Sequence, residues 1–155
     1  MIEKLNQILQ WLIKKSQKAH ICVSCNTQQT LSTTEKKISL SGLHADSNAG
    51  DVFELYNGGV RVLKDSYVSV TGALYSNTGL AEGDLVYISF YINSTKYNTV
   101  HGQKVGASNA NTFTIAECIL KLNAGDVLYM YAVNQSGPRG TIPTYYQNRL
   151  TVKEL

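Results

Sequence analysis

Apolar and polar residues alternate with period two on both sides of a short polar break at residues 123–126. The alternation runs through Leu120 and Leu122 before the break and continues through residues 127–133 after it. This pattern predicts two strands joined as a hairpin by the Asn-Ala-Gly-Asp turn. Residues 127–133 are apolar in both phases, which favours a central strand covered on both faces. The apolar phase slips upstream of Leu120, and the slip predicts a bulge or bend near residues 116–117.

The rest of the chain after residue 18 repeats this alternation in short runs separated by turn residues. The runs predict further strands at residues 21–25, 38–41, 52–56, 60–63, 67–75, 85–92, 96–100 and 149–154. Asn57-Gly58-Gly59 predicts a hairpin turn, whereas residues 26–37, 42–50, 76–83, 101–111 and 135–144 are polar or rich in glycine and predict loops. Many short strands at this spacing predict an antiparallel sandwich of two sheets, of Greek-key or jelly-roll type, over residues 19–155.

Residues 1–18 have a different, helical period. Four apolar residues fall at successive spacings of three, four and three: Ile2, Leu5, Leu9 and Leu12. This is the seam of a coiled coil, and Ile8 and Ile13 widen it in a way that favours three or more chains. The alternative is an amphipathic helix packed on its own domain. Trp11 lies off the seam, so we expect it to contact the globular part or a docking partner.

Composition adds to the expectation that part of the surface is covered by another chain. Charged residues make up 16% of the 155 residues, whereas about 25% is usual, and there are ten tyrosines. The net charge of +3 is small, and no basic run is interleaved with aromatic residues, so we expect no nucleic-acid partner. No apolar run reaches the ~18 residues of a membrane span, and the first residues lack the pattern of a signal peptide. We therefore expect synthesis in the cytosol, with the three cysteines as thiols.

Two clusters have the residue types of metal sites without the full pattern. Cys22 and Cys25 have the spacing of one zinc half-site, with His20 nearby and Cys118 elsewhere in the chain. A second pair is missing, and residues three apart on a strand face opposite ways, so we expect buried thiols. Residues 46–51 are similar to a calcium loop, but the glycine is one position early and no glutamate follows at the twelfth position. We expect a plain turn there, and no metal or cofactor in the protein.

Catalytic motifs such as G-x-S-x-G are absent from the sequence, and we expect a protein that is not an enzyme. A candidate ligand surface lies beside the last loop, where Tyr145, Tyr146, Gln147 and Asn148 combine aromatic faces with amide groups. Those groups suit a saccharide. The alternative is that the tyrosines pack between subunits.

Three stretches resemble one family. Residues 118–133 resemble the penultimate hairpin of C1q/TNF-like jelly rolls, and residues 67–74 resemble that family's Gly-x-Tyr strand, with Asp65 in place of the glycine. Residues 148–155 resemble the family's closing strand, and more particularly the C-termini of small phage virion proteins with this fold. No collagen-like repeat precedes the jelly roll, and the predicted coiled coil takes its place. The resemblance implies a homotrimer packed about a threefold axis.

Together these features predict a non-enzymatic structural protein of a bacteriophage virion: a homotrimeric head fibre, decoration protein or tail-associated spike made in the host cytoplasm. Residues 1–18 would anchor it to capsid or tail proteins, and the jelly-roll head would face outward, with host surface glycan as a candidate ligand. Two alternatives remain. One is a bacterial C1q-like interaction module, of spore-coat or ligand type, and the other is a glycan-binding lectin.

Overall fold

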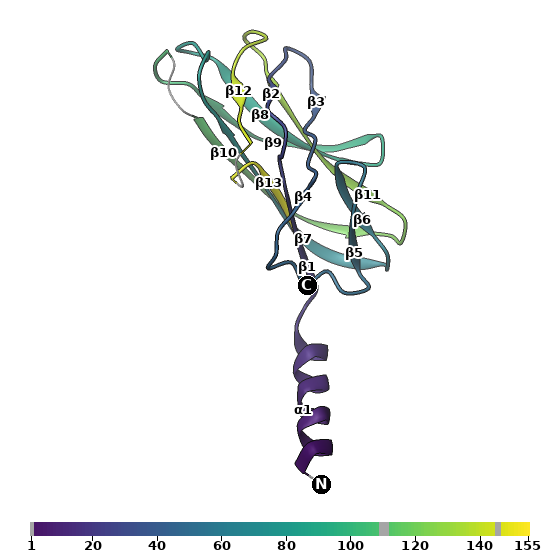
Figure 1. Cartoon of the computed structure of the whole chain (residues 1–155). Helices are drawn as coiled ribbons and strands as arrows, with labels where there is room; N and C mark the ends of the chain where they lie inside the picture. The colour runs from purple at the N-terminus through teal and green to yellow at the C-terminus, as the bar shows by residue number, and fades with distance from the viewer. Residues whose placement is uncertain (1, 109–111, 145–146) are drawn as a thin grey trace.

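The computed structural model describes residues 2–108, 112–144 and 147–155, except for the side chains of residues 14–16, 98–101 and 112–113. It shows a β-sandwich with one helix projecting from its end (Figure 1). The elements are α1 (Ile2–Ser16), β1 (His20–Ser24), β2 (Gln29–Thr30), β3 (Lys36–Lys37), β4 (Gly42–Leu43), β5 (Phe53–Tyr56), β6 (Gly59–Val62), β7 (Ser66–Ser76), β8 (Leu85–Ile92), β9 (Thr95–Lys104), β10 (Thr112–Leu122), β11 (Val127–Asn134), β12 (Thr141–Ile142) and β13 (Arg149–Glu154).

Two antiparallel sheets form the sandwich. The first has the order β10-β7-β13-β1-β4, and the second has the order β5-β6-β11-β8-β9, with β3 also paired to β11. Neighbours in the first sheet are all non-consecutive strands, and in the second sheet β11 lies between β6 and β8, which is the connectivity of a jelly roll rather than of a meander. The mostly β, antiparallel jelly-roll sandwich with an N-terminal helix is therefore confirmed, and so is the central position of residues 127–134.

The core lies between the sheets and is built from the inward positions that period two predicts. Val68 and Val70 on β7 meet Phe90 on β8 and Met130 on β11, and all four side chains are fully buried. A Cβ atom at Gly72 would lie 2.8 Å from the Phe90 ring, so this position of β7 admits only glycine unless the core shifts. The backbone of β7 is thus in close contact with the Phe90 ring of the other sheet at this position.

The predicted hairpin at residues 123–126 is wrong, although both strands and the turn exist. β10 pairs with β7 along its whole length, while β11 pairs with β6 and β8 in the other sheet. The turn is a corner between sheets, held where Asp126 accepts a hydrogen bond from the Asn123 backbone N–H at 2.9 Å. The Ala124 N–H donates to Asp65 at 2.8 Å, so the aspartate in the usual glycine position ties the corner to the start of β7. The period-two pattern of apolar residues indicates which residues form strands, but it does not indicate which strands pair with each other.

The predicted bulge near residues 116–117 is also wrong. The register of β10 on β7 runs without interruption from Thr112 opposite Ser76 to Leu122 opposite Ser66. Ala116 and Leu120 face the core, so Ile115 and Ile119 face outward. The phase slip in the sequence therefore marks apolar residues on both faces of one straight strand.

Residues 38–41 do not form the predicted strand, although Ile38 and Leu40 are buried and the two serines between and after them are exposed. The segment leaves β3, which pairs with β11 in the second sheet, and enters β4, which pairs with β1 in the first. Because it crosses from one sheet to the other, it cannot keep a ladder with either. β9 in turn continues to Lys104, beyond the predicted end at residue 100.

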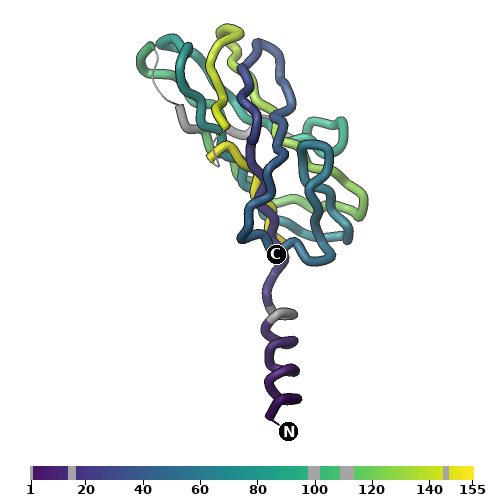
Figure 2. Tube along the Cα trace, viewed as in Figure 1, coloured from purple at the N-terminus to yellow at the C-terminus, as the bar shows by residue number. Residues whose placement is uncertain are grey.

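Both ends of the head lie together at the end from which α1 projects (Figure 2). β1 and β13 are antiparallel neighbours, with His20 opposite Lys153. The Glu154 N–H donates to the Ala19 carbonyl at 2.8 Å, and Lys18 donates to the Leu155 carbonyl at 3.0 Å. The C-terminus is thus fixed beside the root of the helix.

A buried ion pair ties the two long loops at the opposite end of the sandwich. The Asp84 side chain is 1% exposed and accepts two hydrogen bonds from Arg139, from Nη2 at 2.6 Å and from Nε at 2.9 Å. Asn134 and the Ala81 N–H donate to the same carboxylate at 3.0 and 2.9 Å. The hydrogen bonds from Arg139, followed by those from Ala81 and Asn134, outweigh burial and lower the pKa of Asp84 to about 2.

Replacing this carboxylate, as Asp84→Asn, is expected to lower the free energy of unfolding at neutral pH by about 2 kcal/mol. The depressed pKa means that the pair stabilises the fold fully above about pH 4 to 5 and loses that contribution as the pH falls towards 2. Chemical denaturation of both proteins at pH 7 and at pH 3 checks this. The difference between them should shrink at pH 3, and an equal difference at both values would contradict the role of the charge.

Candidate functional site

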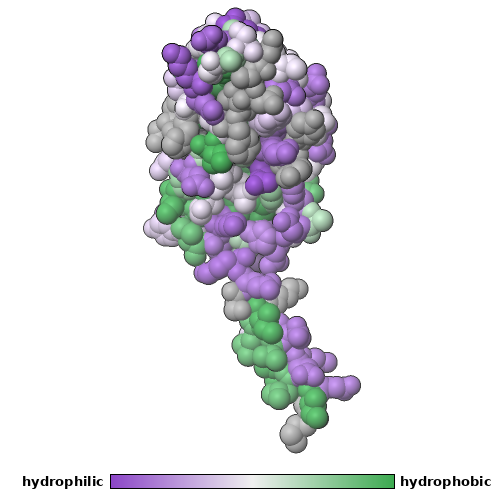
Figure 3. Space-filling model, turned by 90° about the vertical axis from the view of Figure 1, so that its left-hand side faces the viewer, coloured by the Kyte–Doolittle hydropathy of each residue, from purple (hydrophilic) through white to green (hydrophobic). Residues whose placement is uncertain are grey.

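The apolar stripe of α1 is uncovered in the single chain. Ile2, Leu5, Leu9 and Leu12 are between 50% and 76% exposed, and Ile8 and Ile13 beside them are exposed as well. The stripe runs down one side of the helix, with polar side chains on the other (Figure 3). An isolated helix of 15 residues is marginal in water, so a helix with this much exposed apolar surface needs a covering partner.

A second uncovered apolar surface lies on the outer side of the first sheet, which we call the open face. Its bulky members are Ile115 and Ile119 on the edge strand β10 and Tyr67 on β7, which are 46%, 65% and 60% exposed. On the neighbouring strand β7 the outward residues are small: Ser69 is opposite Ile119, and the buried Ala73 is opposite Ile115. Lys153 and Arg149 follow in the same rows on β13. A bulky edge beside a flat strip of small residues suits edge-to-face packing between copies.

Two tyrosines on the outer side of the second sheet are, in contrast, covered within the chain. Tyr91 and Tyr131 stack on each other with ring centroids 3.9 Å apart. Glu35, from the segment before β3, reaches over them and accepts hydrogen bonds from Tyr91 and Lys96 at 2.6 Å each, and from Ser89. Burial would raise the pKa of Glu35, but the hydrogen bonds from Lys96, Ser89 and Tyr91 together lower it, and the bond to Glu35 raises the pKa of Tyr91 to about 12.

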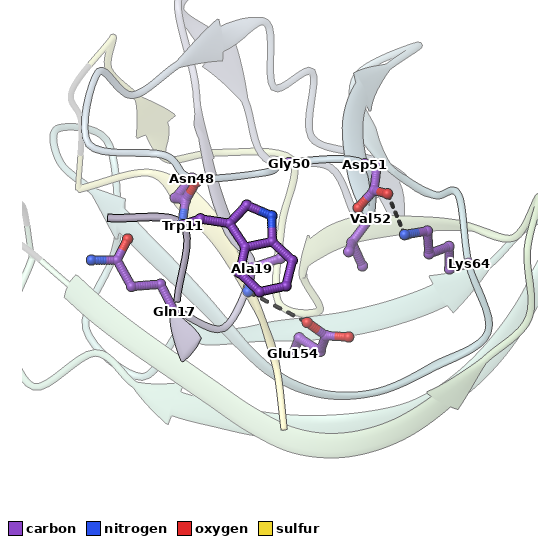
Figure 4. A pocket seen from close by; sticks show the side chains of 9 residues that line it. All are labelled: Trp11, Gln17, Ala19, Asn48, Gly50, Asp51, Val52, Lys64 and Glu154. Atoms are coloured by element: carbon purple, nitrogen blue, oxygen red, sulfur yellow. Dashed lines mark hydrogen bonds and ion pairs between the residues drawn. The ribbon is translucent and has the colours of Figure 1, made fainter. Parts of the chain in front are cut away.

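A hollow of about 510 Å³ lies at the base of the head, where α1 meets the sandwich (Figure 4). We call it the base hollow. Its lining comes from five separate parts of the chain: Trp11, Gln17, Ala19, Asn48, Gly50, Asp51, Val52, Lys64 and Glu154. The Trp11 side chain is 58% exposed and lies over the hollow, while Lys64 and Asp51 form an ion pair on one wall. Glu154 accepts a long hydrogen bond, 3.4 Å, from the Ala19 N–H.

Asn148 does not lie on the candidate ligand surface beside the last loop. This residue is fully buried, its amide donating to the Pro143 carbonyl at 2.7 Å and its oxygen accepting from the Tyr75 N–H at 2.6 Å. It fixes the loop before β13 and presents nothing to a ligand, so its assignment to the ligand surface is wrong. Tyr145 and Tyr146 lie outside the described residues.

The three cysteines have different surroundings, although Cys22 and Cys25 are near each other in sequence. Cys22 accepts a hydrogen bond from Thr151 at 3.4 Å on the outer side of β1, and Cys25 donates to the Thr27 carbonyl at 2.9 Å on the inner side. Partial burial raises the pKa of the Cys118 thiol to about 11, so it stays protonated. Among the described residues, no group of three or more His, Cys, Asp or Glu side chains is placed to hold a metal ion.

The net charge of the protein lies in residues 1–18. This segment holds four lysines and one glutamate, and its net charge of +3 equals that of the whole chain, so the head has no net charge. Within the part of the chain that the structure describes, no helix has the length and apolar character needed to cross a bilayer.

Comparisons with solved structures define the fold class as the TNF-like jelly roll. The Eiger TNF of S. frugiperda superposes with a TM-score of 0.65 at 13% identity, over 89% of this chain and 92% of that one. Murine APRIL, solved at pH 5.0, superposes with a TM-score of 0.66 at 11% identity, over 90% of this chain and 100% of that one. Comparison with protein-family models gives no match, and neither does comparison with curated proteins. At these identities the likeness concerns the fold.

Proposed function

We propose that this chain is a homotrimeric, non-enzymatic attachment protein of a bacteriophage particle, either a head fibre, a decoration protein or a tail-associated spike. The main observation in favour of a trimer is that one chain has two uncovered apolar surfaces, the stripe of α1 and the open face. The TNF-like fold supports it, since the resemblance to this family implies three copies about an axis.

The two surfaces support each other because α1 leaves the head directly from β1, a strand of the sheet that carries the open face. Helices that associate raise the effective concentration of the heads, and heads that associate do the same for the helices. Neither surface alone needs to hold the trimer at low concentration.

The mass of the protein in solution tests the trimer. Light scattering at micromolar concentration should give about three times the chain mass of 17.1 kDa. The expected mass follows from covering both apolar surfaces at once. A single-chain mass under these conditions would contradict the proposal.

The particle itself tests the virion role. An antibody raised against the head should label purified phage particles from a strain that carries the gene, at capsid or tail positions in electron micrographs. Protein found on the surface of the bacterium or in its spore coat, and not on particles, would instead favour a C1q-like interaction module of the cell.

In this arrangement α1 is the segment that meets other virion proteins, and the end with the Asp84–Arg139 pair points away from the particle. The polar side of α1, with its lysines, remains on the outside of a three-helix stalk and is available to an acidic surface on the capsid or tail.

A further inference from the structure

The base hollow has the size and the mixture of groups found in small-molecule sites. Its volume of about 510 Å³ falls within the roughly 300–1,000 Å³ of ligand pockets. The indole of Trp11 is part of the lining, together with amide and carboxylate groups from Asn48, Asp51 and Glu154; Asp51 is directed at Lys64, and Glu154 at the Ala19 N–H (Figure 4). An aromatic face beside hydrogen-bonding groups is suited to a ligand that is apolar on one side and polar on its rim.

The lining of the hollow carries two acidic side chains and one basic one, while Lys18, His20 and Lys153 line the adjoining pocket that shares Glu154. Lys64 is paired with Asp51, which leaves the carboxylate of Glu154 without a cation in the lining. A phosphate or carboxylate ligand would meet this like charge, whereas hydroxyl groups can donate to it. Gln17 and Asn48 add amide groups that both donate and accept.

We propose that the base hollow binds a neutral saccharide, with the C–H face of one sugar ring on the Trp11 indole and its hydroxyl groups bonded by Asn48, Asp51 and Glu154. The inference rests on the proposed attachment function and names a ligand class for it, but it puts the glycan contact beside the stalk and not at the outward end that holds the Asp84–Arg139 pair. Tyr91 and Tyr131 are less suitable, since they already cover each other.

Trp11 and the apolar stripe face different directions on α1. At 3.6 residues per turn, Trp11 lies roughly 140° around α1 from the centre of the stripe formed by Ile2, Leu5, Leu9 and Leu12. Helices that pack through the stripe therefore place Trp11 on the outside of the bundle, where it lies over the base hollow of its own chain.

Trp11 is the sole tryptophan in the sequence, so the emission of the whole protein reports on this site. Full-length protein should be titrated with glucose, galactose, mannose, N-acetylglucosamine and rhamnose up to about 50 mM, well above the millimolar affinity expected for one ring. At least one of these sugars should shift the emission saturably. Galacturonic acid, matched to galactose but anionic, should bind at least about fivefold more weakly because its carboxylate approaches Glu154.

The Asn48→Ala variant should bind the responding sugar about fivefold more weakly, which corresponds to about 1 kcal/mol for one lost hydrogen bond. Gln17→Ala is a second variant with the same expectation, in case Asn48→Ala disturbs the loop. Gln103→Ala, an exposed amide on β9, is the control and should bind like the unaltered protein.

Absence of a saturable shift with all five sugars would overturn the inference, and so would unaltered binding by both hollow variants. The mass of each sample, measured in the same buffer, tests the trimer separately. A trimer that binds no sugar contradicts only the inference, and a single chain that binds sugar contradicts only the proposed assembly.

Discussion

A protein carrying Leu5→Asp together with Leu9→Asp is expected to lose most of its trimer at micromolar concentration. The two leucines are 66% and 52% exposed in the single chain, so the substitutions should spare the fold of the head. In a trimer six leucines are replaced, and at about 1.5 kcal/mol each the loss is at least about 9 kcal/mol. Six carboxylates near the helix axis would repel one another as well.

Sedimentation of the double variant over a range of concentrations checks the result. The matched control is Gln7→Asp with Gln10→Asp, which adds the same charge to α1 outside the stripe and should leave the mass unchanged. If the leucine variant keeps both the mass and the thermal stability of the original protein, α1 is not a trimer seam.

The Ile119→Glu variant is expected to weaken the association of the heads even though α1 is intact. Ile119 is the most exposed isoleucine of the open face, and the residue opposite it on β7 is the small residue Ser69. Loss of apolar burial alone amounts to about 3 kcal/mol per trimer, at about 1 kcal/mol for each partly exposed side chain. The cost of burying three carboxylates beside Glu117 adds to this figure.

Tyr97→Glu is the matched control, since Tyr97 is 52% exposed on β9 of the other sheet. Dissociation constants from dilution series should rise for Ile119→Glu by more than a hundredfold and stay constant for Tyr97→Glu. An equal response of the two variants would show that the open face is not an interface. Circular dichroism should give the same strand content in both, because both side chains point away from the core.

Much of the fold follows from the sequence because inward and outward positions alternate. Residues 149–154 form β13 as predicted, and the buried valines of β7 and β8 lie at the predicted phase. What the pattern could not give is the partner of each strand. The corner at residues 123–126 has the composition of a hairpin turn. Strand pairing shows that the chain changes sheets there, and Asp65 and Asn93, both remote in sequence, are hydrogen-bonded to the corner.

The candidate sites also divide into one that the local sequence predicts and one that depends on residues remote in sequence. The stripe of α1 is local and could be identified from spacing, whereas the base hollow joins Trp11 to Asn48, Lys64 and Glu154, which no local pattern connects. The one available signal is that Trp11 lies off the seam of the helix. Ile115 signals the open face, because its phase is opposite to that of Leu120 and Leu122, but the same phase slip predicts a bulge.

The position of β1 has a mechanical consequence. This strand continues directly from the stalk and is hydrogen-bonded to β13 on one side and to β4 on the other. A pull between the stalk and the far end of the head would shear these ladders, so that many hydrogen bonds resist together. A pull between the two chain ends, which lie side by side, would instead peel β1 from β13 one bond at a time, and would require much less force.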